Sequence, residues 1–378
     1  MHASPLPPPI WVENHQAMKT MLVDLLSQPL VAVDTESNSL YAYKEQVCLI
    51  QFSTPDRDYL VDPLALIDLS ALGEVFADEK IEKIFHAAEY DIICLKRDYH
   101  YCFRNIFDTM HASRILGRSE IGLADLLSTR YGLIVEKRLQ RANWGMRPLS
   151  SEMLYYARLD THYLIDLRNQ LRKELIDNGL LELAEEDFFR LTQANIPNGE
   201  NDNLSCWRMI GRNTLPSAQC AVLQALIEYR DAQARKANLP HFKIISNQAL
   251  IEIAQASPTN VADLDNIASL SKRQSSRHAY GLLQAVNQGL NNRPPARPAS
   301  RRPDDGILAR IDTLKKWRKV TARGLQVESD IVLPRDIAEQ IAYANPTSLD
   351  QLQALMKTTP WRFQRYGEQI LEILMNGH

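Results

Sequence analysis

The first 190 residues alternate between short apolar runs and helical patterns. Leu30 to Val33 is an apolar, valine-rich run that favours a strand, and residues 47–52 read as its hairpin partner. Further strands are predicted at residues 58–62, 81–86 and 103–107. Helical patterns occur at residues 66–76, from about 88, at 109–115, at 123–131, from about 150 and at 180–193. Three antiparallel strands followed by alternating strands and helices predict an α/β domain with a mixed sheet.

Two carboxylates stand at the end of the first of these strands. Asp34 and Glu36 are two residues apart, so on a strand their side chains point to one face, about 7 Å from each other. Like charges at the end of an apolar strand repel each other and lose hydration, and a bound cation would relieve both penalties. A strand end with two solvated acids explains this stretch, taken alone, about equally well.

Two later segments supply further acids. The strand at 81–86 ends in His86 and leads into a helix that carries Asp91, and ligands of such sheets gather at the carboxyl ends of strands. In the helix that begins near residue 150, Tyr156 and Asp160 are four residues apart and therefore share a face. Taken singly, Asp91 reads as a surface acid, and Tyr156 as a core-edge residue bonded to Asp160.

Composition narrows the class of protein. A chain of 378 residues is long enough for two or three domains, and 45% hydrophobic with 24% charged residues is typical of a globular protein. Five cysteines without paired spacing favour reduced thiols, and the proline-rich N-terminus is unlike a secretory signal. No run is long enough to cross a membrane, so we expect a cytoplasmic protein. A net charge of −3 gives no overall reason to expect a nucleic-acid partner.

The ordered motifs resemble those of a known enzyme family. Asp34-x-Glu36, His86 followed five residues later by Asp91, Asp108 at a helix start, and Tyr156-x-x-x-Asp160 are similar to the exonuclease motifs of the DEDD superfamily, tyrosine subgroup. The closest resemblance is to the ribonuclease D family, and residues 144–149 and 206–208 also match its segments. The resemblance implies a ribonuclease H-like fold for this mixed-sheet domain.

The family resemblance implies a role for each matched residue. Asp34, Glu36, Asp91 and Asp160 would be the metal-binding carboxylates, and Tyr156 would orient the attacking water. The implied cofactors are two divalent metal ions, and oxygen ligands without a cysteine or histidine cluster favour Mg²⁺ or Mn²⁺ over zinc. One ion is expected between Asp34, Glu36 and Asp160, and the other on Asp34 and the substrate phosphate, with Asp91 acting through water.

Three neighbouring residues are assigned lesser roles. We expect Asp108 to cap the helix that follows it. His86 reads as a hydrogen-bonded structural residue rather than a metal ligand, and it is also a candidate nucleic-acid-binding residue. Leu40 could wedge against the terminal base of a substrate, although an ordinary packing role explains it equally well.

The C-terminal half contains an internal repeat. Leu226, Tyr229 and Arg230 align with Leu314, Trp317 and Arg318, and further pairs keep the same spacing, so we expect two copies of one small helical bundle. Each copy resembles the HRDC domain (helicase and ribonuclease D C-terminal), an accessory nucleic-acid-binding module. The predicted domains are an exonuclease domain at 1–195 and HRDC domains at 205–292 and 303–378, with a linker at 195–203 and a Pro/Arg-rich connector at 291–302.

Clusters of basic residues in the two bundles could grip a phosphate backbone without reading its sequence. The other interpretation is a solvated face or a purely architectural bundle. The candidates are Lys272, Arg273, Arg277, Lys315, Lys316 and Arg318.

The resulting hypothesis is a metal-dependent 3′–5′ exoribonuclease that releases nucleoside 5′-monophosphates. The resemblance implies RNA with a single-stranded 3′ end as the partner, such as a tRNA precursor, and we expect no membrane association or obligatory protein partner. A DNA exonuclease and a catalytically silent RNA-binding scaffold are the alternatives.

Overall fold

The computed structural model describes residues 7–66, 68–196, 205–211, 215–297 and 303–376. Most of the linker predicted at 195–203, and the end of the connector predicted at 291–302, lie outside these residues. The chain divides into two compact units. One contains the N-terminal α/β domain and the second helical repeat, and the other contains the first helical repeat together with residues 38–46.

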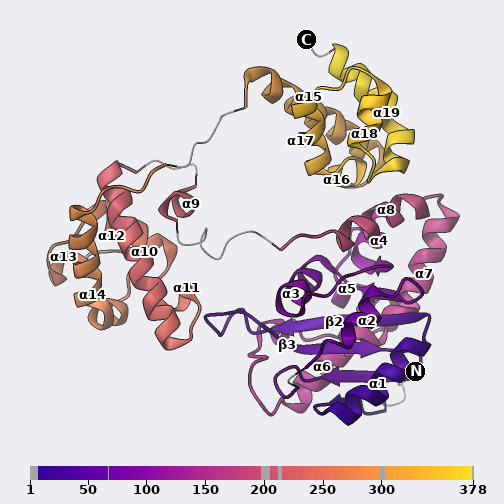
Figure 1. Cartoon of the computed structure of the whole chain (residues 1–378), viewed down its shortest axis with the longest axis horizontal. Coiled ribbons are helices and arrows are strands. Elements are labelled where there is room, and N and C mark those ends of the chain that lie inside the picture. The colour runs from indigo at the N-terminus through magenta and orange to yellow at the C-terminus, as the bar shows by residue number, and fades with distance from the viewer. Residues whose placement is uncertain (1–6, 67, 197–204, 212–214, 298–302, 377–378) are drawn as a thin grey trace. The chain divides into compact units, whose positions relative to one another are not determined.

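The α/β domain is built on a six-stranded mixed sheet with the strand order β1-β4-β3-β2-β5-β6 (Figure 1). β2, β3 and β4 are antiparallel, while β5 pairs with β2 and β6 in parallel and β1 pairs with β4 in parallel. The mixed sheet is as predicted, although β1, which is only three residues long, was not expected. The strands are β1 (Ile10–Val12), β2 (Leu30–Ser37), β3 (Val47–Ser53), β4 (Asp58–Val61), β5 (Glu82–Phe85) and β6 (Ile106–Asp108).

Helices cover both faces of the sheet. Alternate residues of a strand therefore pack into two different apolar clusters, one on each face. Val31 and Val33 of β2 pack into one apolar cluster, and Ala32 between them packs into another. The predicted helix at 66–76 is confined to α2, and the long helix after residue 150 is divided at Tyr163 into α6 and α7. The helices are α1 (His15–Ser27), which was not predicted, α2 (Leu72–Ala77), α3 (Glu89–Tyr99), α4 (Thr109–Ile115), α5 (Leu123–Tyr131), α6 (Ser151–His162), α7 (Leu164–Asp177) and α8 (Leu181–Thr192), with a short 3₁₀ turn at Lys137–Arg141.

The two C-terminal repeats are helical bundles of the same design, as predicted. A long helix, a four-residue helix, two further helices and a closing helix occur in the same order in both copies. The first contains α10 (Ser217–Ala237), α11 (His241–Ile244), α12 (Asn247–Ala256), α13 (Val261–Asp265) and α14 (Lys272–Asn291), preceded by α9 (Cys206–Ile210). The second contains α15 (Asp305–Leu325), α16 (Ser329–Val332), α17 (Arg335–Ala344), α18 (Leu349–Leu355) and α19 (Pro360–Asn376).

The second bundle is fixed to the α/β domain by a buried ion-pair network. Arg362 at the start of α19 is fully buried, and its guanidinium donates to Glu186 at 2.8 Å and to Asp187 at 2.9 Å, both on α8. Ile331 and Trp361 of the bundle extend an apolar cluster of the α/β domain. This bundle therefore shares a core with the α/β domain. Among the described residues, no helix is both long and apolar enough to cross a membrane.

Candidate active site

β2 and α6 bring three carboxylates together. Asp34 and Glu36 lie near the end of β2, and α6, which packs against β2, β3 and β4, carries Asp160. One carboxylate oxygen from each of the three residues lies within 4.8 Å of the other two, a spacing that allows all three to share one cation. Gln51 on β3 donates to Asp34 at 3.3 Å, which steadies that side chain against the neighbouring strand.

Tyr156 lies one helical turn before Asp160 on α6. Its ring is 5% exposed and packs beside Trp144, with 6.1 Å between ring centroids. Burial and the nearby carboxylates raise the pKa of Tyr156 far above its usual value, so the phenol keeps its proton and hydrogen-bonds to Asp160. Because a protonated phenol cannot act as a base at neutral pH, this side chain is suited to orienting a bound molecule.

Asp91 lies near the cluster but is not one of its three members. It is buried on the first turn of α3 and accepts a short hydrogen bond from Thr35, the residue between Asp34 and Glu36. Burial raises the pKa of Asp91 to about 7. Its charge contributes to the raised pKa values of Asp34 and Glu36, so Asp91 shares the electrostatic field of the site.

The electrostatics of the cluster fit a cation. Burial, followed by repulsion from neighbouring carboxylates, raises the pKa values of Asp34 and Glu36 well above their usual range, and burial raises that of Asp160 to about 8. A divalent cation would supply the missing positive charge. Carboxylate oxygens are hard ligands that suit Mg²⁺ or Mn²⁺, and the described residues place no histidine or cysteine in the cluster.

Asp108 caps α4 as predicted, and it has a further role that the sequence did not reveal. Its carboxylate accepts from the backbone of Met110 and His111 at the start of α4. It also accepts from Ala88, the residue at the start of α3, at 2.7 Å. One buried carboxylate therefore holds together the first turns of α4 and of the helix that carries Asp91.

The other predicted neighbours of the site have different surroundings. His86 lies after β5, where its Nδ1 is 2.9 Å from the hydroxyl of Thr109, and burial lowers its pKa. This contact matches the expected hydrogen-bonded histidine. Leu40 is partly exposed in the loop after β2.

Arg147 is a structural residue that the sequence analysis missed. Its guanidinium makes a two-pronged contact with Asp62, at 2.6 and 2.7 Å, and donates to the carbonyl of Cys48 on β3 at 2.6 Å. It thus fastens the segment before α6 to the sheet and helps to place Tyr156 and Asp160. The position of Arg147 in segment 144–149, which resembles the family, was the one sequence feature that could have indicated this role. Its partner Asp62 lies 85 residues earlier in the chain, so the contact could not be predicted.

The predicted phosphate-binding residues are exposed, with one exception. Arg318 donates to the carbonyl of Leu333 within its own bundle at 2.8 Å, and burial lowers its pKa. The equivalent Arg230 donates to the carbonyl of Ile245 at 3.0 Å in the first bundle. The shared contact explains why arginine occurs at both positions and gives Arg318 a packing role inside its own bundle, while its predicted phosphate contact stays a prediction. The exposed candidates are Lys272, Arg273, Arg277, Lys315 and Lys316.

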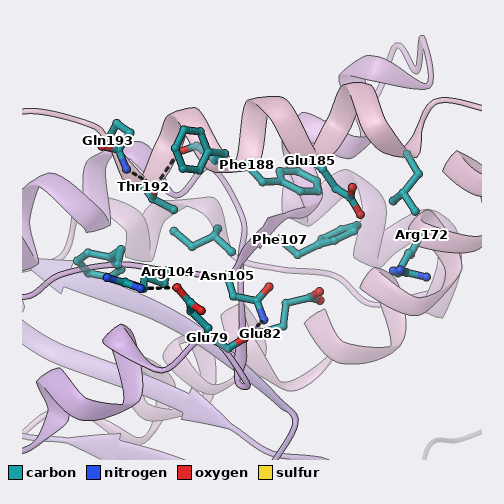
Figure 2. Close-up of a pocket in the computed structure, with 14 residues that line it drawn as sticks. Glu79, Glu82, Arg104, Asn105, Phe107, Arg172, Glu185, Phe188, Thr192 and Gln193 are labelled. Atoms are coloured by element: carbon teal, nitrogen blue, oxygen red, sulfur yellow. Dashed lines mark hydrogen bonds and ion pairs between the residues drawn. The ribbon is translucent and has the colours of Figure 1, made fainter. Parts of the chain in front are cut away.

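A surface pocket of the α/β domain lies apart from these residues. Figure 2 shows Phe107 and Phe188 beside charged residues such as Glu82, Glu185 and Arg172. Its lining comes mainly from β6 with the loop before it and from α8, and includes none of the predicted site residues.

The mixed sheet and the convergent acids beside a helical tyrosine define a 3′–5′ exonuclease domain of the DEDD type. A family model described as a 3′–5′ exonuclease matches residues 9–176, and the HRDC domain model matches residues 219–286 and 307–374. The chain therefore belongs to the ribonuclease D-like exonucleases with two HRDC domains.

Individual relatives agree with this assignment. Ribonuclease D of Bartonella henselae is 29% identical over 94% of this chain and 88% of its own length. The exosome complex exonuclease RRP6 of Saccharomyces cerevisiae is 33% identical over 83% of this chain, which spans 46% of that protein. The crystal structure of Escherichia coli RNase D covers 98% of this chain and 99% of its own, with a TM-score of 0.70 and 21% identity, which shows the common fold.

Proposed function

We propose that this chain hydrolyses RNA from its 3′ end and releases nucleoside 5′-monophosphates. The convergence of Asp34, Glu36 and Asp160 within 4.8 Å carries the proposal, because it offers an all-oxygen site to a divalent cation. Family membership supports the exonuclease reaction. RNA as the substrate is supported by the relatives named ribonuclease D, and the E. coli protein is described as an exoribonuclease involved in structured RNA processing.

Each residue of the site then has a task. Asp34, Glu36 and Asp160 would hold one divalent ion, and Asp34 would share a second with the substrate phosphate, with Asp91 contributing through water. Two such ions, when bound, stabilise the charge on the attacking and leaving oxygens of a phosphodiester. Tyr156 holds the attacking water by a hydrogen bond without removing its proton. The water oxygen bonds to phosphorus as the bond from phosphorus to the 3′ oxygen of the preceding nucleotide breaks. The water loses a proton to solvent, the 3′ oxygen takes one up from solvent, and a nucleoside 5′-monophosphate is freed.

Asp34→Asn tests the assignment of the site. The amide keeps the size of the side chain but removes the charge, so we expect hydrolysis of a short RNA with Mn²⁺ to fall by roughly 1,000-fold or more. Asp56→Asn, which changes an exposed acid in the loop after β3, is the control and should match the wild type. Wild-type hydrolysis by Asp34→Asn would remove Asp34 from the reaction.

Tyr156→Phe tests the role of the phenol. Loss of the hydroxyl should lower the single-turnover rate by roughly 100-fold, since misplacing a reacting group by about 1 Å has an effect of that size. RNA affinity should stay within about twofold, because the hydroxyl is proposed to orient water rather than RNA. The adjacent Tyr155 is half-exposed, so Tyr155→Phe is a matched control. An equal fall in rate and affinity would contradict a water-orienting role.

The substrate is tested by matched oligonucleotides. RNA and DNA of one sequence should be compared with Mn²⁺, and we propose that RNA is degraded faster. We also propose that precursors of tRNA with a single-stranded 3′ extension are shortened, with the folded body held by the HRDC domains. Faster degradation of DNA would favour a DNA exonuclease, and failure to cut either polymer would favour a silent scaffold.

A further inference from the structure

The loop that follows the acid-bearing strand β2 belongs to the compact unit of the first HRDC domain. Residues 38–46 join β2 to β3, and the loop is closed at its base by Asn38. The side chain of Asn38 accepts from the backbone of Gln46 at 2.9 Å. The first loop residue is only two positions after Glu36, so the loop joins directly onto the end of the strand that carries both acids.

Tyr43, in this loop, is held by the first HRDC domain at several points. Its hydroxyl donates to Asp231 on α10 at 2.7 Å, and its backbone N–H donates to the side chain of Asn238 at 3.2 Å. The guanidinium of Arg235 lies 5.6 Å from the centre of the tyrosine ring and donates to its hydroxyl at 3.2 Å. His241 contacts the ring edge-on, with 5.6 Å between ring centroids.

The contact continues along the loop and into the core of the bundle. The ammonium group of Lys243 lies 4.0 Å from the centre of the Tyr41 ring, which is a close cation–π contact. Tyr43 itself packs against the apolar core of the bundle. Leu40 lies between the closed base of the loop and these two tyrosines, so its position is restricted from both sides.

The second HRDC domain lacks this binding site for a tyrosine. The positions equivalent to Asp231 and His241 are Lys319 and Ser329, which offer neither the carboxylate nor the imidazole. The shared fold of the two copies therefore does not require Asp231 and His241. Their occurrence in the first copy alone is explained by the contact with Tyr43.

We propose that the first HRDC domain positions the β2–β3 loop for the exonuclease reaction, with Tyr43 and Asp231 as positioning residues. The proposal rests on the proposed function of the carboxylate site. By holding Tyr43, the domain restricts Leu40 and the start of the chain that follows Glu36, the stretch that joins the loop to one of the acids. Loss of this contact should lower the turnover of bound substrate, whereas loss of an RNA-binding contact should weaken binding.

The test uses the full chain and a five-nucleotide RNA. Tyr43→Phe keeps the ring but removes the hydroxyl that donates to Asp231. We expect kcat to fall by about tenfold, equivalent to about 1.4 kcal/mol, which a hydrogen bond to a charged group can supply, with KM within about twofold. Asp231→Asn should have a similar effect, and the double variant should be little worse than either single one. Tyr280→Phe, at an 83% exposed position of the same domain, is the control.

Hydrogen exchange of the loop amides provides a readout that does not depend on activity. Tyr43→Phe should accelerate exchange in residues 38–46 while Tyr280→Phe leaves it unchanged. Wild-type kcat in Tyr43→Phe and Asp231→Asn, or unchanged loop exchange in both, would overturn the proposal. If the wild-type chain cuts no RNA, the proposed function fails, and loop exchange still decides whether Tyr43 and Asp231 hold the loop.

Discussion

The network around Arg362 predicts that the second HRDC domain stabilises the exonuclease domain. The Arg362 side chain is fully buried, and its two partners are also buried, with Glu186 5% exposed and Asp187 10% exposed at their side chains. Arg362→Met replaces the guanidinium with an apolar group of similar length. The substitution leaves two carboxylates in the interface without the cation that faces them.

The expected loss of stability follows from this burial. Removing one partner of a buried ion pair destabilises a protein by about 3–5 kcal/mol, because an uncompensated charge remains. For a folding unit of this size, the melting temperature should fall by roughly 10 °C. The control is Arg335→Met, because Arg335 pairs with Glu339 along the outside of α17 and is 83% exposed, so its loss should lower the melting temperature by less than about 2 °C.

Protonation of Glu186 should make the loss of stability in Arg362→Met depend on pH, whereas a loss of packing alone would not. Burial raises the pKa of Glu186 even with Arg362 present, and loss of the guanidinium should raise it further. A carboxyl whose folded-state pKa lies above its unfolded value binds more protons when folded, so its stability contribution worsens as the pH rises. The deficit of Arg362→Met should therefore be larger at pH 8 than near the ordinary glutamate pKa of 4.5.

Differential scanning calorimetry of the full chain at both pH values is the assay. Adding Glu186→Gln and Asp187→Asn to Arg362→Met should restore part of the melting temperature, since neutral amides are less costly to bury. A melting temperature within 1 °C of the wild type at pH 8 would refute the reasoning, because the buried network could not then exist in solution. A deficit independent of pH would assign the loss to packing instead of charge.

Three further predictions concern the exonuclease domain. Arg147→Lys keeps the charge but not the two-pronged contact with Asp62, so initial rates on short RNA should fall by roughly tenfold while the melting temperature drops only slightly. Asp108→Ala should lower the free energy of unfolding by about 2 kcal/mol in urea titrations, because the starts of both α3 and α4 lose a shared acceptor. Mn²⁺ at 100 times its dissociation constant should stabilise the wild type by about 2.7 kcal/mol. Asp34→Asn should abolish that gain yet melt higher than the wild type without metal, since one buried charge is gone.

Local patterns predicted much of the sheet and the site. Asp34 and Glu36 could be placed on one face because strand periodicity fixes the direction of alternate side chains, and Tyr156 and Asp160 because one helical turn separates them. The helix cap at Asp108 could likewise be predicted, because a capping residue contacts only the next few residues of the chain. Each of these inferences needs only the nearest few residues of the chain.

The interactions that escaped prediction join distant parts of the sequence. Arg147 and Asp62 are 85 residues apart, Arg362 and Glu186 are 176 apart, and Tyr43 and Asp231 are 188 apart. Arginine and lysine residues of the C-terminal half were predicted to contact phosphate. Their charge alone does not reveal whether such a side chain faces solvent or a buried carboxylate. Arg318 is an example of a contact inside the bundle that was not predicted, since its partner is a backbone carbonyl that no sequence pattern marks.

The two HRDC domains use equivalent parts of one fold to hold different segments of the exonuclease domain. Lys243, on the short helix α11, contacts Tyr41. Its counterpart Ile331, on α16, joins the apolar cluster of the α/β domain, and the neighbouring Asp330 pairs with Arg114 of α4. Because these short helices are engaged in protein contacts, an RNA held by the bundles as proposed would have to use other elements. In the first bundle, the exposed Lys272 and Arg273 at the start of α14 belong to a different element, so they can contact a phosphate backbone while α11 keeps its hold on the loop.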